Sequence, residues 1–152
     1  MIFVEKIKRL SPDIPSGLVE QAAAAALRHQ SAPEQAALSI VLADDKRLHG
    51  LNHDYLGVDA PTDVLSFAAD QTDPETGAPY LGDIIISVQR AGEQAARAGH
   101  PVEAEVQLLV VHGVLHLMGH DHADADDKAH MWQAQAEILE QLGLAHIQVR
   151  EE

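Results

Sequence analysis

Three histidines in the last third of the sequence have the spacing of a metal-binding site. His112 and His116 are four residues apart, so both side chains lie on one face if this segment is helical. Gly119 can adopt the positive φ that ends a helix, which lets the chain turn back and present His122 to the same point. Neutral imidazoles bind zinc at about 2.0–2.1 Å, and three protein ligands leave a fourth position for water. The spacing therefore predicts a catalytic zinc site, with one ion per chain.

The alternative is that these histidines are buried polar residues with local hydrogen-bond partners. A single histidine on an apolar helix face more often has that role. Here two would be desolvated on the same face of a very apolar segment, and an unpaired buried imidazole costs about 1–3 kcal/mol. Metal binding is therefore favoured. Sites of three histidines also suit nickel or copper, so the native metal stays open.

The same spacing matches the zinc-peptidase pattern H-E-x-x-H-x-x-G-x-x-H. In those enzymes the glutamate after the first histidine is the general base, and here that position is Gly113. Peptide hydrolysis is thus disfavoured, whereas metal-assisted hydrolysis of another bond is not. His120 is a candidate proton shuttle or alternative ligand, and Asp121 could orient a ligand imidazole. For both, an ordinary turn residue is the alternative, and the general base is not identified.

The elements that must position these histidines follow one another in an α+β order. Apolar runs predict strands at residues 1–5, 37–43, 64–67 and 81–87. Helical spacing and cap residues predict helices at residues 17–30, 46–55, 87–98, 103–118 and 124–142. Residues 103–118 are apolar around most of the helix, which indicates burial, and the run Ile84–Ile86 indicates a central strand. Residues 69–80 are expected to form a surface loop. We expect one domain, residues 1–152, with a small mixed sheet of about four strands against several helices and the three-histidine site in a cleft.

The composition limits the possible partners. The chain has 152 residues with 10 Lys and Arg against 24 Asp and Glu, a formal charge of −14. This charge argues against a surface built for nucleic acid, DNA included, although a small basic cleft is compatible with it. The absence of cysteine excludes disulfides and thiolate ligands. No segment has the apolar core of a signal peptide or of a membrane span, so we expect a cytoplasmic protein without membrane contact. The histidines expected at the surface are His29, His49, His53, His100 and His146.

Three segments of the sequence together have the pattern of a known protein family. They are residues 112–122, HGVLHLMGHDH, residues 52–67, NHDYLGVDAPTDVLSF, and residues 81–87, LGDIIIS. The first is similar to the histidine signature of the YbeY family of bacterial zinc-dependent endoribonucleases. The second resembles the segment N-x-x-Y-R-x-x-D-x-P-T-D-V-L-S-F of that family, and the third resembles its strand L-G-D-I-x-I. The order and spacing of the segments also agree, and the resemblance extends from about residue 38 to 142.

The resemblance implies an α+β fold in which the three histidines hold zinc in a cleft. It further implies hydrolysis of a phosphodiester in single-stranded RNA, in 16S ribosomal RNA 3′-end maturation and ribosome quality control. The implied partners are ribosomal RNA or the small ribosomal subunit and its associated proteins. The family positions that match Thr62, Asp63 and Ser66 would line or brace the cleft. The expected mechanism is attack of a metal-activated water on the phosphodiester, with the metal stabilising the developing oxyanion.

The sequence departs from the family pattern at positions that bear on RNA binding. Leu56 replaces the arginine that the resemblance assigns to phosphate contact, and Val58 and Ala60 stand where basic residues are common. Leucine cannot replace the planar, bidentate donors of arginine. Either another cation supplies the contact, or RNA cleavage is weakened. The candidate cations are Lys46, Arg47, Arg90 and Arg97. The alternative function is accordingly a catalytically weak, metal-containing ribosome-assembly or chaperone-like factor that binds RNA or protein.

Overall fold

A computed structural model describes residues 1–121 and 123–147, which form four strands and five helices. In chain order these are β1 (Ile2–Lys6), α1 (Ser16–His29), β2 (Ala37–Ala43), α2 (Asp45–Leu56), β3 (Val64–Thr72), β4 (Pro79–Ser87), α3 (Val88–Ala98), α4 (Val102–Leu117) and α5 (Ala125–Gln141). The predicted α+β class is confirmed. Asp44 caps the N-terminus of α2, because its Oδ1 accepts a hydrogen bond from the backbone N–H of Arg47 at 2.8 Å.

The sheet has the strand order β1-β2-β4-β3. Strand β2 is parallel to β1 and to β4, whereas β3 and β4 are antiparallel, so the sheet is mixed. Strand β4 lies between β2 and β3, and the side chains of Ile84 and Ile86 are fully buried. The prediction that the run of isoleucines forms a central strand is therefore confirmed.

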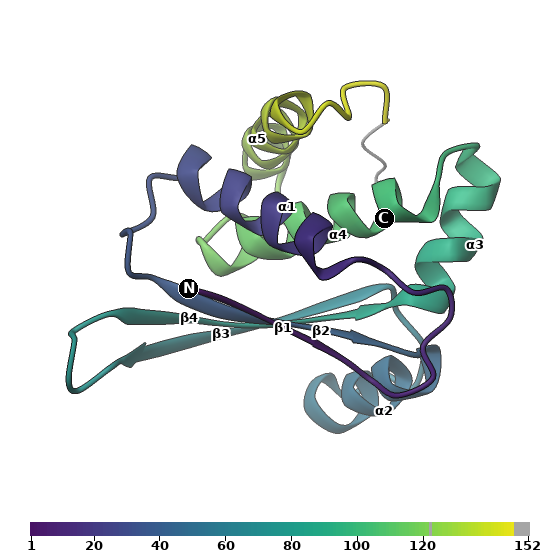
Figure 1. Ribbon diagram of the computed structural model, residues 1–152, viewed down its shortest axis with the longest axis horizontal. Helices are drawn as coiled ribbons and strands as arrows, with labels where there is room; N and C mark the ends of the chain where they lie inside the picture. Colours follow the sequence, from purple (N-terminus) through teal and green to yellow (C-terminus); the bar gives the residue numbers. More distant parts are fainter. Residues whose placement is uncertain (122, 148–152) are drawn as a thin grey trace.

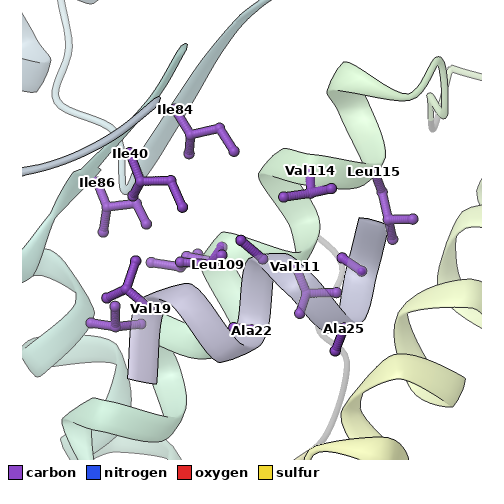
Figure 2. Close-up of a cluster of buried hydrophobic side chains, with 14 of the residues drawn as sticks. Val19, Ala22, Ala25, Ile40, Ile84, Ile86, Leu109, Val111, Val114 and Leu115 are labelled. Carbon is purple, nitrogen blue, oxygen red and sulfur yellow. The ribbon is translucent and has the colours of Figure 1, made fainter. Parts of the chain in front are cut away.

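Helices α1, α4 and α5 lie on one face of the sheet and α2 lies on the other (Figure 1). The larger core fills the space between α1, α4 and the sheet, where Val19, Ile86 and Leu109 meet (Figure 2). A smaller cluster beside α2 is formed by Ala43, Leu48, Leu65 and Ile85. Helix α4 is buried on nearly all sides, as its composition predicts. No helix within the described residues is long and apolar enough to cross a membrane.

The prediction of a surface loop over residues 69–80 is wrong at both ends. Strand β3 continues to Thr72 and β4 begins at Pro79, which leaves a turn between them. The N–H of Asp73 donates to the carbonyl of Ala78 at 2.8 Å, and the N–H of Gly77 donates to the carbonyl of Asp73 at 2.8 Å. Pairing with the neighbouring strand outweighs the weak strand preference of these polar and small residues, because strand preference depends on context.

Gly113 allows α4 to approach the sheet closely at the point where the histidines are carried. A Cβ atom at this position would lie 2.8 Å from Cγ2 of Ile84, nearer than real side chains come. The hydroxyl of Ser66 on β3 faces the same backbone, 3.5 Å from the carbonyl oxygen of Gly113. The glycine therefore holds the last turns of α4 directly over β3 and β4.

Candidate metal centre

A cleft of about 520 Å³ contains the side chains of both α4 histidines. Its walls come from β3 and the segment before it, from α4, from α5 and from the end of α2. The lining residues are Leu56, Thr62, Asp63, Val64, Leu65, Ser66, Glu105, Leu108, Leu109, His112, His116, Trp132 and Gln135.

His112 and His116 face each other across one turn of α4. Their Nε2 atoms are 3.1 Å apart, and their ring centroids are 4.7 Å apart with an interplanar angle of 74°. The helical spacing seen in the sequence thus brings both rings to one point of the cleft. Trp132 of α5 lies beside them, with its ring centroid 5.9 Å from that of His112.

The Nδ1 atoms of both rings are hydrogen-bonded to oxygen atoms. Nδ1 of His116 donates to the backbone carbonyl of His120 at 3.0 Å, because a carbonyl can only accept. Nδ1 of His112 lies 3.0 Å from Oε1 of Gln135, which is also an acceptor. In the neutral rings the proton is therefore on Nδ1, and the lone pair is on Nε2, the atom that faces the other ring.

This donor set fits a metal ion. Two tetrahedral zinc–nitrogen bonds of about 2.0–2.1 Å would place the two nitrogens about 3.3 Å apart, close to the 3.1 Å observed. Hydrogen bonding of the second ring nitrogen to an oxygen is also what orients ligating histidines. The third predicted ligand, His122, lies outside the described residues. Within the part of the chain that is described, no group of three or more His, Cys, Asp or Glu residues is placed to hold a metal, so the three-histidine site stays a prediction.

Thr62, Asp63 and Ser66 line the same cleft as the two histidines. Asp63 is 6% exposed, and its carboxylate accepts from the N–H of Val64 at 2.8 Å and from Nε2 of Gln94 at 3.3 Å. These bonds anchor the segment that leads into β3. The carboxylate therefore braces the wall of the cleft.

The two predicted catalytic candidates next to the third histidine have different surroundings. The backbone of His120 contacts His116, whereas its ring is turned toward α1, with Nε2 2.7 Å from Oε1 of Gln30. Asp121 is exposed. The structure thus brings the carbonyl group of His120, rather than its imidazole, to the candidate metal centre.

Gln135, which bonds His112 and is only 2% exposed, belongs to no motif that is visible in the sequence. A signal was present, because Gln135 is a polar residue on the α5 face that buries Met131 and Ile138. An amide on an otherwise apolar helix face requires a buried partner.

The prediction that His100 is a surface residue is wrong. Its side chain is 8% exposed, and Nε2 lies 2.7 Å from Oε1 of Glu105, whose side chain is fully buried. Glu105 also lines the cleft, two helical turns before His112. Burial of a carboxylate is costly unless it is paired, which explains why the histidine is drawn inside. His53 and His146 are exposed, as predicted.

None of the four candidate cations is among the described residues that line the cleft. Arg90 binds Asp45 through Nε at 2.9 Å and Nη2 at 3.0 Å, and this contact lowers the pKa of the Asp45 carboxyl. Lys46 and Arg47 line a separate hollow beside α2. Nε of Arg97 donates to the carbonyl of Glu93 at 3.4 Å. Among the described residues that line the cleft, the acidic side chains are those of Asp63 and Glu105.

Comparison with known proteins assigns the chain to a family. Residues 5–143 match the family described as "Endoribonuclease YbeY", which is most of the chain. The chain belongs to the YbeY endoribonuclease family. The resemblance seen in the sequence is thereby confirmed.

Relatives within the YbeY family are similar over nearly their whole length. An "Endoribonuclease YbeY" from Chloroflexus aurantiacus is 50% identical over 135 residues, 85% of this chain and 88% of that protein. A second, from Roseiflexus castenholzii, is 43% identical over 150 residues, 95% of this chain and 94% of that protein. The solution structure of TM1509 from Thermotoga maritima matches this chain with a TM-score of 0.59 at 20% sequence identity. The match covers 100% of this chain and 99% of that one, so the two share a fold.

Proposed function

We propose that this chain is a zinc-dependent endoribonuclease that hydrolyses a phosphodiester in single-stranded RNA. The observation that carries the proposal is the pair of Nε2 atoms, 3.1 Å apart in a cleft, on rings whose Nδ1 atoms are bonded to oxygens. His122 would complete the ligand set of His112 and His116. Membership of an endoribonuclease family supports RNA as the substrate and hydrolysis as the reaction.

The residues around the cleft would orient the ligands and the substrate. A zinc ion bound here would supply a Lewis acid that lowers the pKa of water and polarises a phosphoryl oxygen. Gln135 and the carbonyl of His120 keep the Nδ1 protons in place, so that Nε2 points into the cleft. The hydroxyl groups of Thr62 and Ser66 are neutral donors at the cleft wall and would contact phosphate oxygens.

We further propose that the reaction serves 16S ribosomal RNA 3′-end maturation and ribosome quality control in the cytoplasm. Phosphate contacts by Lys and Arg supply most non-specific affinity for nucleic acid. With a net charge of −14 and no cation among the described cleft residues, the chain alone would attract RNA weakly. The proposed partners, ribosomal RNA or the small ribosomal subunit and its proteins, would therefore guide the substrate to the cleft.

A second candidate function is a catalytically weak, metal-containing ribosome-assembly or chaperone-like factor. It is favoured by Leu56, which occupies the cleft where the family pattern has arginine. Assays of single-stranded RNA cleavage with and without a chelator separate the two functions. Cleavage that stops with chelator and returns with added zinc supports the enzyme. Binding to small-subunit particles without any turnover supports the assembly factor.

Leu56→Arg is expected to increase RNA cleavage. Leu56 is 58% exposed and lines the cleft, so an arginine there adds a charged donor without displacing the core. A hydrogen bond to a charged group contributes about 1.5–3 kcal/mol, which corresponds to roughly a tenfold or greater rise in kcat/KM. Leu56→Lys is the matched variant, since it adds charge without the bidentate fork and should give a smaller gain. An unchanged kcat/KM in Leu56→Arg would show that the missing cation does not limit the reaction.

Gln135→Leu is expected to weaken zinc binding by about 10–100-fold, the usual cost of losing the partner that orients a ligating histidine. Leucine fills a similar volume but cannot accept the Nδ1–H of His112. Competition against a chromogenic chelator measures the affinity. Gln133→Leu, an exposed position on the same helix, is the control and should bind like the unmodified protein. Equal affinities for the two variants would contradict the orienting role.

A further inference from the structure

A chain of polar side chains leads from the turn beside the candidate metal centre to α1 and α5. Nε2 of His120 lies 2.7 Å from Oε1 of Gln30, and Nε2 of Gln30 lies 2.9 Å from Nδ1 of His29. Nε2 of His29 in turn lies 3.0 Å from Oε1 of Glu137. The chain therefore joins the turn after α4, the C-terminal end of α1 and the C-terminal part of α5.

The donors and acceptors of this chain agree with one another. An amide oxygen accepts, so Nε2 of His120 donates to Gln30, and the amide nitrogen of Gln30 donates to Nδ1 of His29. Since Nδ1 of His29 accepts, its proton is on Nε2, which donates to the carboxylate of Glu137. Every bond points the same way, an arrangement in which successive hydrogen bonds strengthen one another.

Gln30 lies at the centre of this chain, and its side chain is not needed to end α1. The backbone N–H of Gln30 donates to the carbonyl of Ala26 at 3.1 Å and completes the last turn of the helix. The side-chain amide instead makes one bond toward His120 and one toward His29.

The turn that carries His120 is held on two sides. On the backbone side, the N–H of His120 donates to the carbonyl of Leu115 at 2.9 Å, and the N–H of Gly119 donates to the carbonyl of His116 at 3.0 Å. On the side-chain side, the ring of His120 is held by Gln30. Between these two attachments lies the carbonyl group that accepts Nδ1–H of His116 at 3.0 Å.

We propose that Gln30 is a positioning residue for the metal centre. Gln30 holds the ring of His120, and this keeps the carbonyl group of His120 in its direction. That carbonyl group in turn determines the tautomer and the orientation of the His116 ring. This inference rests on the proposed metal-binding function. It adds that α1, a helix that contributes no ligand, determines how well a ligand on α4 is oriented.

The test uses Gln30→Met, which keeps the length of the side chain and removes both hydrogen bonds. In the metal-free protein, 15N NMR of the His116 ring should show a loss of the Nδ1-protonated tautomer. Zinc affinity should fall at least about threefold, less than the roughly 10–100-fold expected for a partner that bonds a ligand directly. The visible absorption of the Co²⁺-substituted protein, which reports coordination geometry, should also change.

Gln21→Met is the control, because Gln21 is exposed on the same helix, and it should leave all three measurements unchanged. His120→Phe removes the same hydrogen bond from the other partner and should cause the same loss of the Nδ1-protonated tautomer. This variant tests the proposal even if Gln30→Met does not fold. The double variant should add little to either single one, as residues of one network are not additive. A lower melting temperature in Gln30→Met with an unchanged tautomer and an unchanged Co²⁺ spectrum would overturn the proposal. Normal tautomers without any zinc binding in the unmodified protein would instead overturn the proposed function.

Discussion

His116→Ala is expected to abolish both zinc binding and RNA cleavage. The substitution removes one of the two Nε2 atoms that face each other at 3.1 Å and leaves its counterpart on His112 without the second donor. The loss of affinity should exceed the roughly 10–100-fold that follows removal of an orienting partner, because a ligand itself is lost. Since the remaining ligands cannot complete a three-histidine site, kcat/KM on single-stranded RNA should fall below detection.

Metal content per chain after dialysis and cleavage of an RNA oligonucleotide measure the two effects. His130→Ala is the matched control, since His130 is an exposed histidine on the neighbouring helix α5. It should retain zinc and activity. Full zinc content in His116→Ala would exclude His116 as a ligand. Cleavage that persists in this variant would identify a contaminating nuclease or a reaction that does not use the metal centre.

Gly113→Glu is expected to prevent the chain from folding. The Cβ atom alone would lie 2.8 Å from Cγ2 of Ile84, in the fully buried layer between α4 and β4. Overpacking of a core costs about 1–3 kcal/mol, and burial of an unpaired carboxylate costs several kcal/mol more. The sum is comparable to the total stability of a domain, about 5–15 kcal/mol. Circular dichroism and urea unfolding measure the loss.

Gly113→Ala separates the two costs, because it adds the Cβ without the charge and should lose about 1–3 kcal/mol. Gly50→Ala is the control, since Gly50 lies in α2 with no atom within 4 Å of its added Cβ. It should be neutral or slightly stabilising, by up to about 1 kcal/mol. A folded Gly113→Glu protein with the unfolding midpoint of the parent would refute the close contact between α4 and the sheet.

The close contact between Gly113 of α4 and Ile84 of β4 also explains why position 113 is not the glutamate of the zinc-peptidase pattern. The sequence shows that the general base of those enzymes is missing, and Gly113 replaces it. In the structure, the side chain of Ile84 fills the space next to Gly113 where a larger side chain would have to lie. A glutamate there would collide with Ile84, so the packing as well as the chemistry disfavours a peptidase mechanism.

Local sequence patterns predicted the structure correctly where it is determined by contacts between residues close in sequence, or where the segment is strongly apolar. The pair His112 and His116 follows from one helical turn, and the burial of β4 follows from three consecutive isoleucines. The continuation of β3 to Thr72 was missed because pairing with β4, rather than the polar residues themselves, determines it. The resemblance to known sequences supplied the substrate class, which spacing alone does not reveal.

Contacts between distant segments could not be predicted from single-residue patterns. Gln135 meets His112 because of the rotation of α5 about its own axis, which is set by the packing of the whole helix. His100 is drawn inside by Glu105, a residue that in the sequence looks like an ordinary charged position near the start of a helix. His120 was considered for its ring, whereas its backbone is what contacts the candidate metal centre.

The sheet separates the larger core around α1 and α4 from the smaller cluster beside α2, and the candidate site has walls from both sides. The histidines are carried by α4, which belongs to the larger core, whereas Leu56 at the cleft ends α2, which packs on the smaller cluster around Leu48 and Ile85. Regions held by few buried contacts open more easily than the main core. We therefore expect mutations in α2 to change the cleft beside Leu56 while His112 and His116 on α4 keep their geometry.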